Sequence, residues 1–434
     1  MIRDVERQAH DKPSRFLYDH QLHPLYPLPS SLSTTPRTLS TLSLVPRRRL
    51  GRDVAAVDIT HPHGGGPNPS DDAIVTCLGQ RFLSDTIYTS IGSSGLVALN
   101  PHKYVPASGD AVLRKYAAEY RDTSEDKQPL PPHIFQLANN AYSHMRRTAQ
   151  DQSMLLETGS SKSENYRLAI ETILEFNSPS EFVPETFAHA RTLFNPNASS
   201  VGKYTELQFS DRGRLHGVKT LDDLLERNRV AGAPNGERNF HILYYLVAGA
   251  SPEERLHLLD KPKYRYFGQH RAAPVPNARP NDDAMRAMSA QMCQLIAAIL
   301  HLGNLEFTID RHRNEDAAVV RNTDVCNIVA DFLGIHAQDL ETSLAADNRD
   351  DLAKSLYSLL FSWISEHMNQ RLCREDYVTF IGLFDIPGPQ NMSSRPNSLD
   401  QFCINFANER LQNLTQQRLF ESHVAEYTAE GVIP

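Results

Sequence analysis

A lysine and a serine, Lys162 and Ser163, stand side by side in the segment LLETGSSKSEN. A phosphate-binding loop has a glycine, four residues, a second glycine, a lysine, and then serine or threonine. Here Leu156 stands at the first glycine position and Ser161 at the second, although Gly159 remains. The segment by itself leaves two interpretations open: a nucleotide site with a weakened loop, or a surface turn with an ordinary lysine.

The chemistry of such a loop explains why these residue types matter. Its backbone amides point at phosphate oxygens, and the positive end of the following helix adds to the attraction. Lysine contacts the β- and γ-phosphates and the hydroxyl binds Mg²⁺, which are the two groups that Lys162 and Ser163 supply. Glycine adopts positive φ readily and leaves room for a ligand close to the backbone. Leu156 at the first glycine position therefore weakens the turn. Ser161 at the second is small enough to be tolerated if its φ is negative.

Residues on both sides of this segment predict the elements that would position it. Residues 154–156 form a short apolar strand, and the run from Ser163 has the spacing of a helix. The stretch 132–150 is also helical, and 84–100 alternates apolar and small residues as a strand does. A strand, a loop with lysine and serine, and a helix are the context that a phosphate loop requires.

Further elements follow towards the carboxyl end. Strands are predicted over 204–209 and 377–384, the second ending on Asp385, and a buried helix is predicted over 288–302. Trp363, the only tryptophan, is predicted to be a core residue. We therefore expect an α/β chain with large helical insertions.

The stretch 397–430 contains neither glycine nor proline and is predicted to be one long helix. Asn397 or Ser398 can cap its amino end. A helix of this length indicates a mechanical element or a long packing spine. Its spacing marks one apolar face, which comprises Leu399, Phe402, Cys403 and Phe406.

The composition indicates a soluble globular protein, with 40% hydrophobic and 22% charged residues among 434. The formal net charge is −8, which argues against nucleic acid as a partner. Five scattered cysteines without a C-x-x-C pair fit a reducing compartment better than disulfides or zinc. No apolar run reaches the ~18–20 residues needed to span a bilayer, so we expect no membrane segment.

The first part of the chain differs from the rest. Residues 1–72 are rich in proline, serine and threonine and are predicted to be a disordered leader and linker. The ordered domain is expected to comprise residues 73–434.

Seven motifs over residues 73–432 occur in the order of one protein family. They are ALNPHKY (98–104), PPHIFQLANNAYSHMRRTAQDQS (131–153), NPNASSVGKY (195–204), GERNFHILYYLVAGA (236–250), LHLGNLEF (300–307), FIGLFDIPGPQ (380–390) and NSLDQFCINFANERLQN (397–413). Together they resemble the myosin motor head, and more narrowly the myosin-like head of fungal chitin synthases. The third motif resembles switch I, the sixth switch II and the seventh the relay helix. The resemblance implies an α/β fold of the P-loop NTPase type with a mostly parallel central sheet, truncated after the relay helix.

The resemblance also implies that the chain binds ATP with Mg²⁺. Lys162 and Ser163 would hold phosphate and the metal, and Ser199 would be a second metal ligand. Asp385 would act on the metal through water, and Gly388 would donate its amide to the γ-phosphate. The four catalytic positions would then be Lys162, Ser199, Asp385 and Gly388. The remaining nucleotide contacts would be Asn100, Pro101, Tyr104, Glu157, Thr158, Gly159, Ser160, Ser161, Glu164 and Asn195.

Besides Leu156 and Ser161, four further site positions depart from the family pattern. Ser200 stands where the family has a switch I arginine, and Gln390 where it has a switch II glutamate, and those two residues form the ion pair that closes the site. Ala198 replaces a serine and Val201 a phenylalanine. Because phosphoryl transfer depends on positioning and charge stabilisation, we expect hydrolysis to be very slow or absent and ATP binding to be weakened.

The resemblance implies a cellular setting as well. The family partner is the actin filament, and the family works in the cytoplasm, on the cytoskeleton and at the plasma membrane of growth sites and septa. Because the chain ends soon after the relay helix, we expect residual actin affinity at best and no force generation. The Q-x-x-R-W motif of the synthase region is absent, so we expect no glycosyltransferase activity from this chain.

Three interpretations remain open from the sequence. The chain is a myosin-like head that binds ATP with weak or absent ATPase, a non-catalytic pseudo-motor that docks on actin or on a synthase partner, or a truncated chitin synthase fragment without a stable fold. Nucleotide-dependent thermal stabilisation separates the first from the second. A cooperative unfolding transition separates both from the third.

Overall fold

The computed structural model describes the chain from residue 71 onwards, with gaps. The described residues are 71–91, 94–103, 105–106, 108–119, 130–157, 162–174, 182–193, 195–250, 258, 264–267, 290–309, 318–344, 346–391, 397–421, 424, 428–429 and 431. All of them lie in the second of two compact units, Val54–Pro434. The predicted leader therefore lies almost wholly outside the described residues, and the first described helix, α2, spans Asp71–Leu83.

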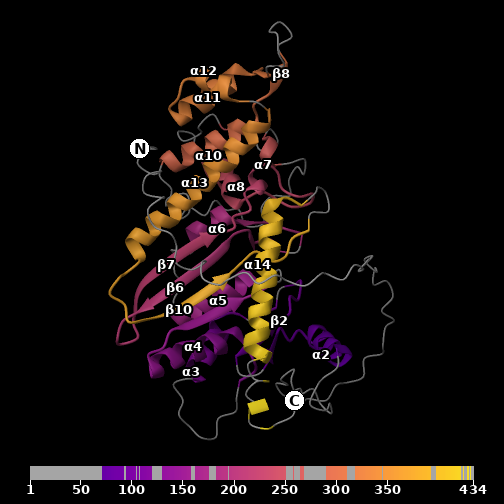
Figure 1. Ribbon diagram of the computed structural model, residues 1–434, viewed down its shortest axis with the longest axis vertical. Coiled ribbons are helices and arrows are strands. Elements are labelled where there is room, and N and C mark those ends of the chain that lie inside the picture. The colour runs from indigo at the N-terminus through magenta and orange to yellow at the C-terminus, as the bar shows by residue number, and fades with distance from the viewer. Residues whose placement is uncertain are drawn as a thin grey trace. The chain divides into compact units, whose positions relative to one another are not determined.

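The largest described sheet has four strands in the order β3-β10-β6-β7 (Figure 1). β3 and β10 are parallel, whereas β10 with β6 and β6 with β7 are antiparallel. The prediction of a mostly parallel sheet is wrong for these strands. A short turn joins β6 to β7, and a short connection permits only antiparallel pairing. The strands are β3 (Gln152–Leu156), β10 (Thr379–Asp385), β6 (Gly202–Phe209) and β7 (Leu215–Asp223), which confirms the three strands predicted in these regions.

A side chain closes the outer edge of β7. The Asn369 carboxamide donates through Nδ2 to the Thr220 carbonyl at 2.6 Å and accepts through Oδ1 from the Thr220 amide at 2.8 Å. It thus makes the pair of hydrogen bonds that a neighbouring strand would make. Asn369 lies in α13 (Ala346–Leu372), so this helix covers an edge that would otherwise be open to pairing with another chain.

Two helices, α4 and α5, pack on the sheet against β3 and β10. One apolar cluster joins Phe135 and Leu168 of the helices to Leu207 and Leu383 of the strands. It also includes Tyr88, from a small hairpin. The elements are α4 (Ile134–Thr148), α5 (Lys162–Leu174), β1 (Tyr88–Ile91), β2 (Gly95–Ala98) and α3 (Asp110–Glu119), and the predicted helix over 132–150 is confirmed.

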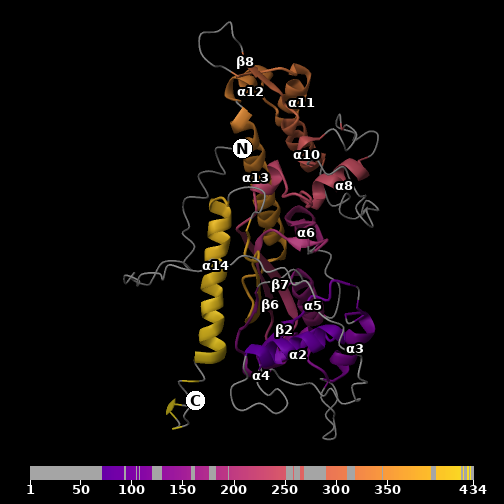
Figure 2. The same cartoon turned by 90° about the vertical axis from the view of Figure 1, so that its right-hand side faces the viewer.

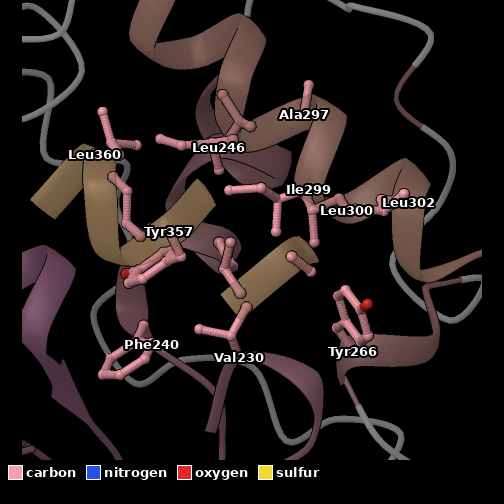
Figure 3. Close-up of a cluster of buried hydrophobic side chains, with 14 of the residues drawn as sticks. Val230, Phe240, Leu246, Tyr266, Ala297, Ile299, Leu300, Leu302, Tyr357 and Leu360 are labelled. Atoms are coloured by element: carbon pink, nitrogen blue, oxygen red, sulfur yellow. The ribbon is translucent and has the colours of Figure 1, made fainter. Parts of the chain in front are cut away.

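A second apolar core is helical and includes α13 (Figure 3). At its base the rings of Phe240 and Tyr357 stack at 5.0 Å, and the Tyr357 hydroxyl donates to the Phe187 carbonyl at 2.6 Å. The helix predicted over 288–302 is confirmed as α10 and is buried along most of its length. The further elements of this region are α6 (Phe182–Ala188), α7 (Asn228–Ala231), α8 (His241–Gly249), η3 (Arg265–Phe267), α10 (Ala290–Gly303), β8 (Phe307–Ile309), β9 (Ala318–Val320), α11 (Thr323–Leu333) and α12 (Ala337–Ser343).

The helix predicted over 397–430 is shorter than expected. α14 spans Leu399–Gln416 and passes into a π turn, η4, at Gln417–Glu421 (Figure 2). Its amino end is closed as predicted by Ser398, whose amide donates to the Gln401 side chain at 2.9 Å in a capping box.

The apolar face marked by the spacing is not the face that α14 buries. Phe402 is 65% exposed, and Leu399 and Phe406 are exposed with it. The buried residues are Gln401, Ile404 and Asn408. The reason is that α14 packs on a loop of polar backbone groups, which calls for amide side chains on the contacting face.

The core position predicted for Trp363 is also wrong. Trp363 is 51% exposed and stacks on His367 at 4.9 Å, whereas Tyr357, Phe361 and Ile364 occupy the buried side of α13. Tryptophan is often half-buried because of its size. Within the described residues, no helix has the length and apolar character needed to cross a membrane.

Candidate nucleotide site

The parallel strands β3 and β10 end side by side. Their register pairs Leu156, the last residue of β3, with Asp385, the last residue of β10. The loop after β3 leads into α5, which begins at Lys162. In a sheet of this kind, ligands bind beyond the carboxyl ends of parallel strands, and a helix N-terminus there attracts phosphate.

Several predicted contacts lie outside the described residues. They are Thr158, Gly159, Ser160 and Ser161 of the phosphate loop and Tyr104 after β2. Lys162 and Ser163 are placed as the first two residues of α5, but their side chains are outside the description. Asn100 and Pro101 directly follow Leu99, beyond the end of β2, and the Asn100 side chain accepts from the His102 amide at 3.0 Å. This bond closes a turn in the predicted purine-binding loop.

The first turn of α5 carries a charged cluster. Glu164 pairs with Arg167 at 2.6 Å, and Arg167 also pairs with Glu171. Burial lowers the pKa of Arg167, but the two carboxylates outweigh it, so that the pKa is raised and the charge is kept. On the next residue, Asn165 accepts from the Tyr88 hydroxyl at 2.8 Å. Glu164 is thus committed to its own helix, which weakens its assignment as a nucleotide contact.

The segment that resembles switch I contains β5 (Ala198–Ser199), which forms a short ladder with β4 (His189–Ala190) just before it. The Ser199 hydroxyl donates to the Val201 carbonyl at 3.1 Å. With its proton committed to that carbonyl, the hydroxyl oxygen has only lone pairs for any other contact, as a Mg²⁺ ligand requires. Asn195 instead uses its side-chain oxygen to accept the Asn197 amide at 2.9 Å. Its predicted role as a phosphate contact would need the other side-chain atom, Nδ2.

The segment that resembles switch II, residues 380–390, begins in β10 and continues past its last residue, Asp385. Side chains of α14 form hydrogen bonds with this segment. Asp385 is only 3% exposed at the strand end, so its carboxylate is held inside the protein. Beyond it, the Asn408 amide donates to the Pro387 carbonyl at 2.7 Å, next to Gly388. The Thr415 hydroxyl of the same helix donates to the Glu157 carboxylate. α14 therefore contacts both switch II and the first residue after β3.

The two positions that lack the family ion pair make separate contacts. The Ser200 amide donates to Ala188 and its carbonyl accepts from Glu226, both at 2.9 Å. Gln390 accepts through its side chain from Gln401 at 3.1 Å. The backbone of Gln390 also exchanges two hydrogen bonds with the Asn405 side chain, at 2.7 and 2.9 Å. Two neutral side chains thus stand where a charged pair would close the site.

A pocket behind switch I is separate from these contacts. Its lining includes Val201, Lys203 and Asp222, and none of the predicted nucleotide contacts. Burial is the main cause that raises the pKa of Asp222, against the opposing effects of a hydrogen bond with Ser365 and of the nearby charge of Lys203. The pocket adjoins Val201, where the family pattern has the larger phenylalanine. We do not assign it to the nucleotide.

Sequence reasoning missed three residues of this region, Asn197, His189 and His241. The Asn197 side-chain oxygen lies 3.2 Å from Nδ1 of His189 and 3.1 Å from Nε2 of His241. Asn197 and His241 stand in two of the seven motifs, but no local pattern relates residues 44 positions apart. Only the tertiary packing brings them together.

Together, the fold and this arrangement define an α/β protein with a mixed sheet and a helix that contacts both loops of the site. The chain belongs to the myosin head (motor domain) family, whose model matches residues 68–433. This confirms the resemblance seen in the seven motifs.

Two curated relatives are named as chitin synthases. The chain is 44% identical over 420 residues to "Chitin synthase 8" of Mycosarcoma maydis, covering 84% of this chain and 21% of the relative. It is 39% identical over 429 residues to "Chitin synthase 5" of Cryptococcus neoformans, covering 84% and 22%. A third relative, "Myosin-I heavy chain" of Dictyostelium discoideum, is 31% identical over 417 residues, covering 84% and 17%. The chain thus spans about a fifth of the length of these relatives.

Proposed function

We propose that this chain is a myosin-type head that binds ATP with Mg²⁺ and hydrolyses it very slowly or not at all. The observation that carries the proposal is the pairing of Leu156 with Asp385 at the end of two parallel strands, directly before a helix that begins at Lys162. This arrangement offers a helix N-terminus, a lysine and a buried carboxylate at one edge of the sheet.

The residues present fit a nucleotide with Mg²⁺ in their chemistry. Lys162 would neutralise phosphate, and the hydroxyls of Ser163 and Ser199 would be metal ligands. Asp385 would accept from metal-bound water, and the Gly388 amide would donate to the γ-phosphate. When bound, Mg²⁺ would neutralise the phosphate charge.

Hydrolysis would be slow because the closing ion pair is replaced by neutral groups. Gln390 is already bonded to Gln401 and Asn405 of α14, and Ser200 is fixed through its backbone. Neither side chain carries the charge that would draw switch I onto switch II. The transition state would therefore lose the electrostatic stabilisation on which phosphoryl transfer depends.

A non-catalytic pseudo-motor is the second candidate, and the amide network around Gln390 favours it. That network joins switch II to α14 through hydrogen bonds between neutral groups. Under either candidate we propose a cytoskeletal setting with actin as partner, in a chitin synthase system that builds the cell wall. This part of the proposal follows from the names of the relatives and from the family.

The test is a titration of the purified chain with a fluorescent ATP analogue and Mg²⁺. Lys162→Ala is measured beside the wild type, with Lys219→Ala on β7 as the control. Saturable binding that Lys162→Ala loses and Lys219→Ala keeps would support nucleotide binding. If a wild-type chain that unfolds cooperatively shows no binding, ATP binding is rejected and the pseudo-motor remains.

A further inference from the structure

Two buried histidines share one acceptor in switch I. Asn197 Oδ1 lies within hydrogen-bond distance of His189 Nδ1, at 3.2 Å, and of His241 Nε2, at 3.1 Å. An amide oxygen has two lone pairs and no proton, so both ring nitrogens must donate to it. This fixes the tautomer of each ring: His189 carries its proton on Nδ1 and His241 on Nε2.

The two histidines come from different parts of the fold. His189 lies in β4 and is paired with Ser199 in the switch I ladder. His241 opens α8, next to Phe240 of the large helical core. Asn197 therefore ties the switch I loop to its own ladder and to the packed core at once.

Burial, together with the charges around it, keeps the His241 ring neutral. Burial is the main cause that lowers its pKa to about 4, and the nearby guanidinium groups of Arg238 and Arg229 act in the same direction. A neutral ring donates from one nitrogen only. The bond to Asn197 therefore engages the single N–H that His241 offers.

The switch I ladder needs such support because it is short. β4 and β5 form two residue pairs, and a bridge from Ala190 to Phe240 adds a further backbone contact. A ribbon this short depends on contacts with its surroundings, because two strands alone are marginally stable at best. Asn197 lies between the predicted phosphate contact Asn195 and the predicted metal ligand Ser199. Its side chain accepts two hydrogen bonds, one from each histidine.

We propose that Asn197 is a positioning residue of the nucleotide site: by accepting from His189 and His241 it holds switch I so that Ser199 is presented to Mg²⁺. This rests on the proposed nucleotide binding. Asn197 does not touch the nucleotide in this role but acts through Ser199, two residues further on. Loss of either histidine donor would loosen the loop and weaken the hold on metal and phosphate.

Substitutions can remove or preserve each bond separately. Asn197→Ala removes the acceptor, whereas Asn197→Asp keeps an oxygen at the same position. His189→Leu and His241→Leu each remove one donor. His189→Asn and His241→Gln keep an N–H close to the positions of Nδ1 and Nε2. His216→Leu is the control, because His216 lies on β7 and pairs with the exposed Asp376.

The experiment measures the release rate of a fluorescent ATP analogue and the Mg²⁺ concentration for half-maximal binding. Asn197→Ala and the two leucine variants should speed release on the order of fivefold and shift the Mg²⁺ requirement upwards, as expected for loss of one or two hydrogen bonds. Asn197→Asp, His189→Asn and His241→Gln should have release rates and Mg²⁺ requirements close to those of the wild type. The His216→Leu variant should match the wild type.

Nitrogen-15 spectra of histidine-labelled protein give a second readout that needs no nucleotide. In the wild type, the signals that the His189→Asn and His241→Gln variants assign should show His189 protonated on Nδ1 and His241 on Nε2, and Asn197→Ala should change both. An Nε2 tautomer of His189 in the wild type would overturn the proposal. Unchanged release and Mg²⁺ dependence in Asn197→Ala, with binding intact in the wild type, would reject the positioning role alone. A wild type that binds no analogue would reject the proposed function and this role with it.

Discussion

The Thr415 hydroxyl of α14 donates a hydrogen bond to the carboxylate of Glu157, the first residue after β3. The two residues are 258 positions apart in the chain. Asn408 of the same helix binds the Pro387 carbonyl of switch II. α14 is thus attached both to the beginning of the phosphate loop and to switch II, so a shift in either loop reaches the helix by its own contact.

Removing the Thr415 hydroxyl tests the first of these attachments. Thr415→Val should lower the free energy of unfolding by about 1–3 kcal/mol, because the hydrogen bond has a charged acceptor. Urea unfolding measures the change. Thr342→Val is the control, since the Thr342 hydroxyl bonds to a backbone carbonyl on an exposed helix and its loss should cost about 0.5 kcal/mol or less. Equal losses in the two variants would contradict a special role for Thr415.

Restoring the closing ion pair should restore hydrolysis. The double variant Ser200→Arg with Gln390→Glu should raise the phosphate release rate on the order of 10²-fold or more, because it returns charge to both loops. Each single variant should gain little, and Ser200→Arg alone should lose stability, since Ser200 is buried. A steady-state phosphate assay on the wild type, the two single variants and the double variant gives the coupling energy between positions 200 and 390. No gain in the double variant would show that other site departures block the reaction.

Arg229 is predicted to be essential for stability. It is buried and pairs with Glu226 at 2.7 Å and Glu237 at 2.8 Å, and Glu226 is itself 0% exposed. Arg229→Met should cost about 3–5 kcal/mol of unfolding free energy, because two carboxylates lose their buried partner. Arg227→Met is the matched control, since Arg227 is exposed and 3.7 Å from its partner, and it should cost about 1 kcal/mol or less. Similar midpoints in urea for the two variants would refute this assignment.

His241 should make stability depend on pH. Burial, followed by Arg238 and Arg229, lowers its pKa from 6.5 to about 4. Between these values the unfolded chain binds a proton that the folded chain does not. The contribution of neutral His241 to the free energy of unfolding is therefore complete above pH 6.5. It is lost as the pH falls towards 4, by roughly 3 kcal/mol in total.

Comparison with His241→Gln isolates this effect. Urea unfolding of both proteins at about pH 7 and about pH 5 should show a smaller loss of stability in the variant than in the wild type. Parallel losses would mean that His241 titrates normally in the folded protein.

The amide of Asn369 should protect the edge of β7. Asn369→Leu removes both hydrogen bonds to Thr220, so the unfolding free energy should fall by about 1–3 kcal/mol and the exposed edge should promote association. Gln370→Leu, at the exposed neighbouring position, is the control. Light scattering during heating measures the association. Equal scattering from the two variants would argue against edge protection by Asn369.

Local sequence patterns determined much of the fold. The apolar run before the loop, the helical spacing after it and the strand ending on Asp385 were all readable, because spacing reports the period of a helix or a strand. The cap at Ser398 was readable for the same reason, since a capping box involves residues within one turn. The ordered motifs determined the family.

Packing decided what the spacing could not. Phe402 and Trp363 are apolar and sit at helical spacing, yet both are exposed, because the face a helix buries depends on which neighbour it meets. The sheet is mixed because β6 and β7 form a tight hairpin beside the parallel pair. The tie between Asn197 and His241 joins residues from separate elements, and contacts of that kind have no local signature. The sequence by itself thus determined the elements and the family, and the tertiary structure decided their buried faces, the strand directions and the partners of the site residues.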